Sequence, residues 1–506
     1  MFDLLLNGMA IVFAPKMLLL MVFAVFLGTL FGALPGVSAT MAVTLGIPFT
    51  YRMDAVPAIA FLVAIYCASI TGGGMTAILF KIPGVPSSAP TTYDGYPMAQ
   101  RGEAGKALGV QLICSAIGGM FAALCMLLLS PQLTNAALSF GPSELFAISF
   151  MGLSILSSLD TDNICRTIIS GLLGLVLACI GIDPLLGVPR LVFGTRFLTS
   201  GIEMIPVMIG FFAITEVLKQ TNKRDKLDAV GNNAKVKTRM PSLRELFMIK
   251  WTILRCSVLG TVIGILPGAG ATIAAFMCYS MEQKLSKYKE KFGTGIIDGI
   301  AAPEAGNNAA CGGSMVPLLS LGIPGGNAAA IMMSALVLKG VVMGPMLLIR
   351  QPQYLSATFA SMFVSNIIMI FAAIIIAKVF VQILKIPYSI LGPTIVMLAT
   401  IGSFATKNVA VDVILMAIAG LLGFVVVSCK LNSSAMILGL VLGNICETNL
   451  RRAYTIINGR TLLDGTLKLL ARPVTGLVLL VCLMVLLWPI VKPYLAKKKQ
   501  QEGKNA

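Results

Sequence analysis

Two copies of an Ile-Pro-Gly tripeptide could form an anion-binding site. The first, at residues 82–84, precedes Ser87 and Ser88, and the second, at residues 323–325, precedes Asn327. Proline suits the first position of a helix, so we expect Pro324 to begin a helix whose free N–H groups can hold a carboxylate. The residues predicted to bind the anionic substrate are Lys81, Pro83, Gly84, Ser87, Ser88, Pro324, Gly325, Gly326 and Asn327, together with Ser38 and Thr40.

The same motifs have structural alternatives. The Ile-Pro-Gly pair could be two packed turns instead of two helix N-termini that face each other near the middle of a membrane. Lys81 either extends to the membrane interface or pairs, as a compact point charge, with a substrate carboxylate. Glu304 could be a surface residue, although its position after Pro303 favours the first turn of a helix.

A second group of polar residues has the chemistry of a monovalent cation site. Gly312 and Gly313 are expected to interrupt a helix and release backbone carbonyls, which coordinate Na⁺ in many coupled carriers. We therefore expect Na⁺ near Asn308 and Ser314. Hydrogen bonding between helices is the alternative for the asparagines. The predicted cation-coupling residues are Thr71, Gly72, Gly73, Asn307, Asn308, Gly312, Gly313 and Ser314.

These motifs belong to a chain with the composition of a helical membrane protein. Of its 506 residues, 57% are hydrophobic, and the mean hydropathy is +0.91. We expect an all-α polytopic membrane protein with two repeated halves, broken helices, re-entrant hairpins and about 10–14 membrane segments. Uncharged runs of about spanning length lie at 17–51, 55–80, 107–143, 256–281, 305–338, 351–377 and 473–491.

Charge and composition exclude several other functions. The net charge of +17 does not indicate nucleic-acid binding, because the basic residues occupy short loops between apolar runs. The 11 scattered cysteines form no CxxC pair, and histidine is absent, which argues against structural zinc and disulfides. No GxxxxGK[ST] loop is present, so this chain supplies no ATP site. No cofactor is expected apart from a coupling ion, Na⁺ or H⁺.

Breaks within the apolar runs are expected at two Leu-Pro-Gly sites. Pro35 and Gly36 form one, which is either a hairpin or a kinked crossing. Pro267 and Gly268 form the other, which fits a re-entrant hairpin, and an ordinary helix kink is the alternative at both sites. The GxxxG spacings that precede them indicate close helix packing. Before the first run, an amphipathic helix is expected to end ahead of Pro15.

The two halves of the chain resemble each other. GTLFGALPGVSAT at 28–40 returns as GTVIGILPGAGAT at 260–272, TGGGM at 71–75 as CGGSM at 311–315, and KIPGVP at 81–86 as GIPGGN at 322–327. Paired broken helices of this kind indicate a transport site. We predict a first repeat half at 1–218, a basic cytoplasmic linker at 219–250, a second half at 251–470, and a C-terminal helix with a basic tail at 471–506.

These segments resemble a known family. AAPEAGNNAACGGSMVPLLSLGIPGG and TGGGMTAILFKIPGVPSSAPTTYDGYPMAQRG look like the signature segments of the large membrane subunit of the tripartite tricarboxylate transporter family. The resemblance implies a multi-pass carrier of the bacterial inner membrane that works with a small membrane subunit and a periplasmic solute-binding protein. It also implies Na⁺- or H⁺-coupled uptake of carboxylates, and a homodimer is a further candidate assembly.

Two departures from the family pattern concern the substrate. Lys81 stands where the family usually has a polar amide, and Val37–Thr40 replaces a more glycine-rich run. An extra cation suits either an additional substrate carboxylate or a different loop anchor. A membrane-embedded enzyme using Asp94, Glu304 and Lys81 and a scaffold subunit are the competing functions. We expect no enzyme, because the polar groups are mostly amides, hydroxyls and glycines.

Overall fold

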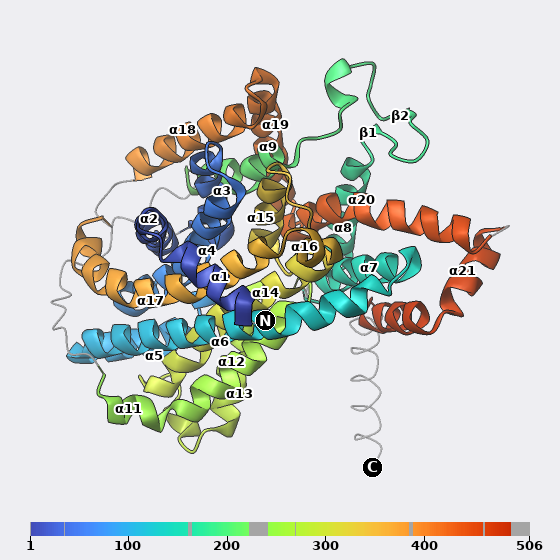
Figure 1. Ribbon diagram of the computed structural model, residues 1–506. Coiled ribbons are helices and arrows are strands. Elements are labelled where there is room, and N and C mark those ends of the chain that lie inside the picture. Colours follow the sequence, from blue (N-terminus) through green and yellow to red (C-terminus); the bar gives the residue numbers. More distant parts are fainter. Residues whose placement is uncertain are drawn as a thin grey trace, which may run out of the picture. The chain divides into compact units, whose positions relative to one another are not determined.

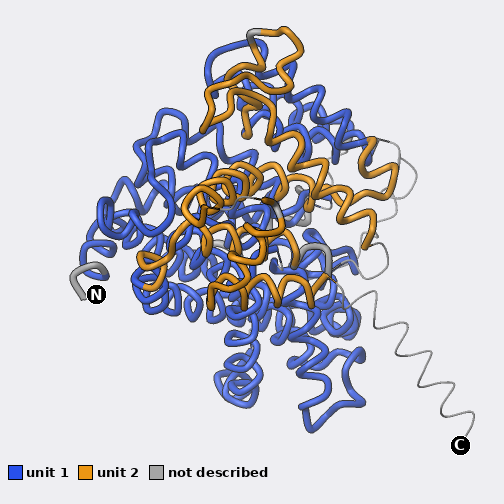
Figure 2. Tube along the Cα trace, turned by 90° about the vertical axis from the view of Figure 1, so that its right-hand side faces the viewer, with its two compact units in different colours: residues 1–135, 205–424 blue, residues 136–204, 425–506 orange. Residues whose placement is uncertain are grey.

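The computed structural model describes residues 2–34, 36–159, 164–221, 241–268, 270–383, 388–458 and 461–486. The chain forms two compact units, unit 1 from residues 1–135 and 205–424 and unit 2 from residues 136–204 and 425–506 (Figure 2). The two halves predicted above divide the chain by sequence similarity, whereas the two units divide it by spatial contacts. The sequence halves therefore remain a prediction. Most of the basic linker, 222–240, and the tail from 487 lie outside the described residues.

The described chain is helical except for one short strand pair (Figure 1). The Pro-, Ser- and Gly-rich segment 81–106 is largely made of short helices. The elements are α1 (Phe2–Val12), α2 (Pro15–Ala33), α3 (Ala39–Thr50), α4 (Ala55–Phe80), η1 (Pro86–Ser88), α5 (Thr91–Met98), η2 (Ala99–Glu103), α6 (Ala104–Leu138), α7 (Pro142–Leu159), α8 (Ile164–Ala178), β1 (Gly181–Ile182), β2 (Pro189–Arg190), η3 (Arg196–Leu198), α9 (Met204–Ile209), η4 (Gly210–Ile214), α10 (Thr215–Thr221), α11 (Leu243–Met248), α12 (Lys250–Ile265), α13 (Gly270–Leu285), η5 (Lys289–Lys291), α14 (Ile297–Leu321), α15 (Asn327–Val337), α16 (Pro345–Arg350), α17 (Pro352–Ile383), α18 (Tyr388–Lys407), α19 (Ala410–Ser428), α20 (Ser433–Ile456) and α21 (Leu462–Leu470).

Two helices, α4 and α14, form the core of unit 1. Every residue from 58 to 79 in α4 and from 299 to 320 in α14 is buried. α2 and α17 pack against α4, while α12 and α13 pack against α14. A helix buried on all sides has no face for water, so any polar side chain in these two helices must find its partners within the protein.

Glycines allow these helices to approach closely. A Cβ atom at Gly32 in α2 would lie 1.8 Å from the carbonyl oxygen of Ser69 in α4. A Cβ atom at Gly264 in α12 would lie 2.3 Å from the carbonyl oxygen of Ala310 in α14. The first glycine of each GxxxG pair makes a similar approach to the same helix. Close helix packing therefore accounts for both spacings.

The chain leaves the helical conformation at both Leu-Pro-Gly sites. Gly36, between α2 and α3, has a φ of +88°, and Gly268, between α12 and α13, has a φ of +85°, which only glycine adopts readily. Pro267 lies in the turn between α12 and α13, and Pro35 lies outside the described residues. α12 and α13 have 16 residues each, so each is shorter than a bilayer core of ~30 Å.

α4 and α14 end in the same way. Lys81 and Gly322, which directly follow them, adopt left-handed conformations with φ of 59° and 72°, a common end of a helix. An Ile-Pro-Gly sequence follows each of them. The expectation that Pro324 begins a helix is wrong, because α15 begins at Asn327. The two glycines after the proline disfavour a helix, whereas the three alanines after Asn327 favour one.

Two expected interruptions are absent. α4 is continuous through TGGGM and α14 is continuous through CGGSM. The glycines accommodate neighbouring backbone instead: a Cβ atom at Gly72 would lie 2.3 Å from the carbonyl oxygen of Thr29, and one at Gly313 would lie 2.4 Å from that of Thr261. The predicted release of carbonyls around Gly312 and Gly313 is therefore wrong.

Unit 2 is built on α20, which packs against α8 and α7. The contact with α8 again depends on glycine, since a Cβ atom at Gly174 would lie 2.0 Å from the carbonyl oxygen of Met436. After α8 the chain forms a small antiparallel hairpin in which Gly181 pairs with Arg190 and Ile182 with Pro189.

Six of the described helices are long and apolar enough to cross a membrane, or seven if the bent pair at 463–470 and 473–486 counts as one span. This number is smaller than the predicted 10–14. Apolar helices such as α3, α8 and α15 are shorter than a span, and α14 contains several polar residues along its length. The protein is a multi-pass helical membrane protein.

Replacing Gly32 with alanine should destabilise the protein. The new methyl group would meet the backbone of Ser69, and overpacking of this kind typically costs about 1–3 kcal/mol. The melting temperature and folded yield of the purified protein measure the effect. Gly171→Ala is the matched control, because its new Cβ would lie 3.9 Å from the nearest neighbouring atom, the carbonyl oxygen of Ala435. Equal melting temperatures for both variants would contradict close packing at Gly32.

Candidate functional site

Buried polar side chains connect α4 and α14 at the centre of unit 1. The Thr71 hydroxyl of α4 donates a hydrogen bond of 3.2 Å to Oδ1 of Asn308 in α14. Earlier in α4 and later in α14, the hydroxyl groups of Tyr66 and Ser314 lie 3.5 Å apart. The side chains of Thr71, Asn308 and Ser314 are at most 1% exposed. The two central helices are thus joined by polar contacts inside an otherwise apolar core.

The two adjacent asparagines extend this network to the first Ile-Pro-Gly loop. Nδ2 of Asn308 donates to Oδ1 of Asn307 at 2.9 Å. Nδ2 of Asn307 in turn donates to the carbonyl oxygen of Ser87 in η1 at 3.4 Å. Because both links are hydrogen bonds between buried groups, a change at Asn308 can reach the loop that follows α4.

Glu304 lies one turn before Asn308 and is fully buried. Its carboxylate accepts hydrogen bonds from Oγ1 of Thr91 at 2.6 Å, Oγ of Ser115 at 2.9 Å and Nε2 of Gln111 at 3.2 Å. In the described part of the chain no Lys or Arg forms an ion pair with it. The expectation that Glu304 sits in a first helical turn or on the surface is wrong, because α14 begins seven residues earlier, at Ile297.

Most of the predicted residues around the first Ile-Pro-Gly sequence are buried, and two of them form hydrogen bonds with the backbone of α4. The Gly84 N–H donates to the carbonyl oxygen of Gly73 at 3.2 Å, and the Ser88 hydroxyl donates to that of Ile70 at 3.4 Å. Ser87 is buried and Pro83 is half-buried. This loop is therefore packed against α4 over most of its length.

Lys81 differs from the rest of this loop. Its side chain is exposed, and its ammonium nitrogen lies 5.7 Å from the centre of the Tyr96 ring, within cation–π range. Neither of its two predicted roles is tested by this position.

The second Ile-Pro-Gly loop is held between α12 and α14. The carbonyl oxygen of Gly325 accepts a hydrogen bond of 3.0 Å from the N–H of Gly268. A Cβ atom at Gly325 would lie 2.6 Å from Cα of Ser314 and 2.7 Å from the carbonyl oxygen of Gly264. Gly326 caps α15 in an extended conformation. The loop thus joins the second Leu-Pro-Gly site to the end of α14.

The remaining predicted residues have different surroundings. Ser38 caps α3, because its hydroxyl accepts a hydrogen bond of 3.1 Å from the N–H of Met41. Thr40 lies in the first turn of the same helix and is half-buried. Asn308 and Ser314, predicted to share a Na⁺ ion, are on one continuous helix, and the Ser314 hydroxyl donates to the carbonyl oxygen of Cys311 at 2.7 Å. Six positions apart, they are separated by ~9 Å along the axis.

The sequence reasoning missed an anchor at Asp94. This fully buried carboxylate accepts hydrogen bonds from the hydroxyl of Tyr279 at 2.8 Å and from three backbone N–H groups just before α14, those of Gly293 at 2.9 Å, Gly295 at 2.8 Å and Ile296 at 3.0 Å. The quoted segment DGYPMAQRG contains Asp94, but its partners lie far along the chain. Asp94 fixes the start of α14 to α5.

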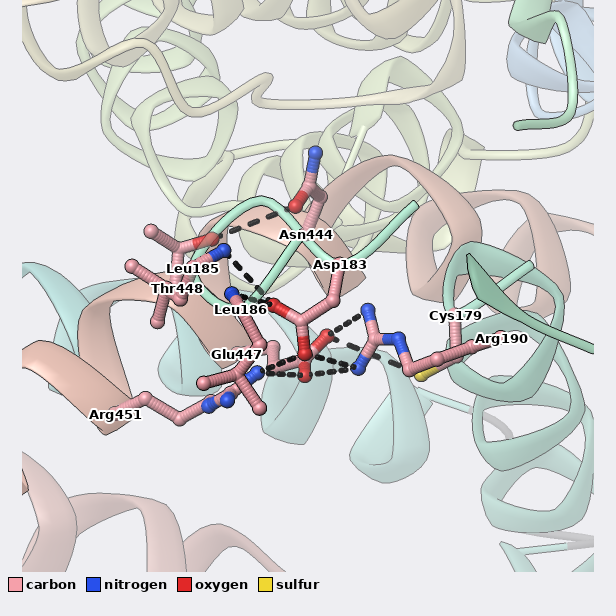
Figure 3. A network of polar contacts seen from close by, with 9 residues as sticks. All are labelled: Cys179, Asp183, Leu185, Leu186, Arg190, Asn444, Glu447, Thr448 and Arg451. Atoms are coloured by element: carbon pink, nitrogen blue, oxygen red, sulfur yellow. Dashed lines mark hydrogen bonds and ion pairs between the residues drawn. The ribbon is translucent and has the colours of Figure 1, made fainter. Parts of the chain in front are cut away.

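A second polar network lies in unit 2 (Figure 3). Arg190 on the hairpin forms two hydrogen bonds with Glu447 of α20, at 2.5 and 3.1 Å. Arg451, one turn farther along α20, lies 2.6 Å from Oδ2 of Asp183. Asp183 also accepts backbone N–H bonds from the turn of the hairpin. The hydrogen bond from Arg451, followed by those of the turn, lowers the pKa of Asp183 to about 2.

The apolar spans and the buried polar contacts define a polytopic membrane protein. Residues 18–438 match the family described as "Tripartite tricarboxylate transporter TctA family". The chain therefore belongs to this family, as the large membrane subunit of a tripartite system, and it is not an enzyme. The resemblance inferred from the sequence is confirmed.

Two proteins of Agrobacterium vitis are similar to this chain. One, named "Uncharacterized 52.8 kDa protein in TAR-I ttuC' 3'region", is 35% identical over 471 residues, 92% of each chain. The other, named "Uncharacterized protein in TAR-II ttuC' 3'region", is 36% identical over 236 residues, 46% of this chain and 96% of the relative. No solved structure matches this chain.

Replacing Asp94 with alanine should greatly lower the fraction of molecules that fold correctly. The change leaves three backbone N–H groups without their acceptor, and an unsatisfied buried donor costs about 1–3 kcal/mol. Size-exclusion chromatography of the detergent-solubilised protein measures the folded fraction. Tyr279→Phe removes one contact only and should have a much smaller effect. Wild-type behaviour of Asp94→Ala would contradict the anchor.

Asp183→Asn should loosen the hairpin of unit 2, because the amide keeps the turn contacts but loses the ion pairs. Hydrogen exchange of residues 181–190 should become faster. Since the pKa of Asp183 is lowered to about 2, its contribution to stability is present above about pH 4 and is lost as the pH falls toward 2. Asp464→Asn breaks an exposed pair with Lys468 and should change exchange little. Equal exchange in both variants would contradict the network.

Proposed function

We propose that this protein is the transport subunit of an ion-coupled secondary transporter that takes up carboxylates, such as tricarboxylates or dicarboxylates, in the bacterial inner membrane. Its coupling ion is Na⁺ or H⁺. Its partners are a small membrane subunit and a periplasmic solute-binding protein. The observation that carries the proposal is the buried polar network from Thr71 through Asn308 and Asn307 to the loop at Ser87.

The arrangement around α4 and α14 supports this function. Each of these helices ends in a left-handed residue followed by Ile-Pro-Gly, and each receives a glycine-rich helix that ends at Leu-Pro-Gly. Gly84 packs against the backbone of Gly32 and Gly73, and Gly325 packs against that of Gly264 and Ser314. The matching contacts favour a duplicated unit, and transporters bind their cargo where such paired helices break.

The substrate is bound, in this proposal, beside the two Ile-Pro-Gly loops. Hydroxyl, amide and backbone N–H donors there can hold a carboxylate without a fixed counter-charge, so that the substrate is also released. Lys81 lies at the exposed entrance of the first loop and suits one carboxylate of a substrate that has several. The predicted 10–14 membrane segments are part of the same proposal and include half-length helices such as α12 and α13.

Uptake should stop when the ion gradient is dissipated while ATP is maintained. Cells that express the complete three-component system, assayed with labelled di- and tricarboxylates, provide the measurement, with ionophores applied separately for Na⁺ and H⁺. This chain has no ATP-binding loop, so the gradient is its source of energy. Continued accumulation without either gradient would contradict ion coupling.

Replacing Asn308 with alanine should abolish uptake while folding is retained, because the amide joins α4 to the first loop. Asn327→Ala should have the same effect at the second loop. Asn449→Ala is the control, since the amide of Asn449 bonds to the carbonyl oxygen of Ile445 in its own helix. Full uptake by both Asn308→Ala and Asn327→Ala would contradict the proposed site.

A further inference from the structure

Glu304 is a buried acid whose described hydrogen-bond donors are all neutral. It is 0% exposed, and its side-chain partners are two hydroxyl groups and one amide, from Thr91, Ser115 and Gln111. Burying a carboxylate without a cation is unfavourable, and neutral hydrogen bonds offset only part of this cost. An acid in such a position in a membrane protein is typical of a proton or ion pathway.

We propose that Glu304 is the proton-binding site of this transporter, protonated and deprotonated once in each transport cycle. The proposal rests on the proposed function and names its coupling ion and residue. A proton from a hydronium ion in the water on one side forms an O–H bond with the carboxylate, which becomes neutral. The same bond breaks when the proton passes to water on the other side.

The packing around Glu304 favours a proton over Na⁺. A Cβ atom at Gly74 would lie 2.6 Å from Oε1 of Glu304 and 2.6 Å from Nε2 of Gln111, so α4 closes the site tightly. An amide N–H and two hydroxyl groups point their hydrogens at the carboxylate. Binding of Na⁺ would require oxygen atoms in place of these donors, and it would also require space for the ion. A proton adds almost no volume.

Gln111 can change its hydrogen bonds when Glu304 binds a proton. Its Nε2 donates both to Glu304 and, at 2.8 Å, to the carbonyl oxygen of Thr71. Its Oε1 is buried and has no hydrogen-bond partner in the described residues. When Glu304 is protonated, a half-turn of the amide brings Oε1 to the new O–H group, and the Thr71 carbonyl loses its donor. The orientation of the amide follows from the bonding pattern.

This rearrangement reaches the loop that binds substrate. Thr71 is bonded through its hydroxyl to Asn308, and the network continues through Asn307 to Ser87. Neutralising Glu304 thus changes the contacts of α4 with the first Ile-Pro-Gly loop. The coupling of proton and substrate then requires no direct contact between them.

Few other groups near Glu304 can titrate. α5 carries the buried acid Asp94 three residues after Thr91, bonded to Tyr279 and to backbone N–H groups, and from α6 the titratable neighbour is the thiol of Cys114. Cys278 of α13 lies against Gly306. Arg255 of α12, Glu282 of α13 and Asp298 at the start of α14 form a cluster with one another, joined through Thr252.

Infrared difference spectroscopy of the purified protein in lipid tests the proposal without transport. The wild type should show the C=O band of a protonated carboxylic acid at about pH 5 and should lose this band as the pH rises to about 9. Glu304→Gln should lack the band. Glu290→Gln, at an exposed acid, is the control and should keep the band. A band that Glu304→Gln retains, or its replacement by a Na⁺-dependent signal, would overturn the proposal.

Transport by the complete complex in proteoliposomes provides the second readout. Glu304→Gln, which mimics the protonated state, should exchange labelled substrate across the membrane but no longer accumulate it against a proton gradient. Gln111→Met, which removes the amide that links Glu304 to Thr71, should weaken accumulation and shift its pH profile. Proton-driven accumulation by Glu304→Gln at the wild-type level would overturn the proposal. If the wild type transports no carboxylate, the proposed function fails, whereas the infrared titration still decides the proton site.

Discussion

Polar groups in the core of unit 1 must find their partners inside the protein, and this requirement shapes α14 and everything packed against it. The helix carries Glu304, Asn307 and Asn308 within a few residues of one another, all fully buried. Their partners come from α4, α5, α6 and η1. Because an unmet polar group costs more in an apolar core than a made bond contributes, these elements are held in one arrangement.

The close approach of helices makes this arrangement possible. Glycine at Gly32 brings the backbone of α2 against α4, and glycine at Gly264 brings that of α12 against α14. Gly74 of α4 leaves room for Glu304 and Gln111, because a Cβ atom there would lie 2.6 Å from a polar atom of each. A larger residue at Gly74 would displace these side chains and disturb the hydrogen bond between them. The glycines and the polar groups therefore depend on each other, and neither set alone explains the core.

Much of the fold could be predicted from the sequence, because long apolar runs and prolines define helix positions. The apolar run at 55–80 coincides with α4, and α1 ends at Val12, ahead of Pro15 as expected. The glycine runs in α4 and α14 predicted breaks, yet both helices are continuous there, since tertiary packing outweighs the low helix propensity of glycine. Family resemblance identified the class of protein, while local spacing gave no sign that α14 begins before Pro303.

The candidate site could be predicted only in part, because its partners are distant in sequence. Asn307, Asn308 and Thr71 were identified from composition and repetition. Their bonds to one another, and those of Glu304 to α5 and α6, depend on how helices far apart in the chain meet. Spacing reveals contacts one turn apart on a single helix, but it carries no information about contacts between helices.

The anchor at Asp94 has a mechanical consequence. The carboxylate accepts hydrogen bonds from three backbone N–H groups just before α14, whereas the far end of that helix stops at a left-handed glycine, Gly322. A helix that is fixed at one end moves most at its other end. Any tilting of α14 is therefore smallest at Asp94 and greatest beside the second Ile-Pro-Gly loop.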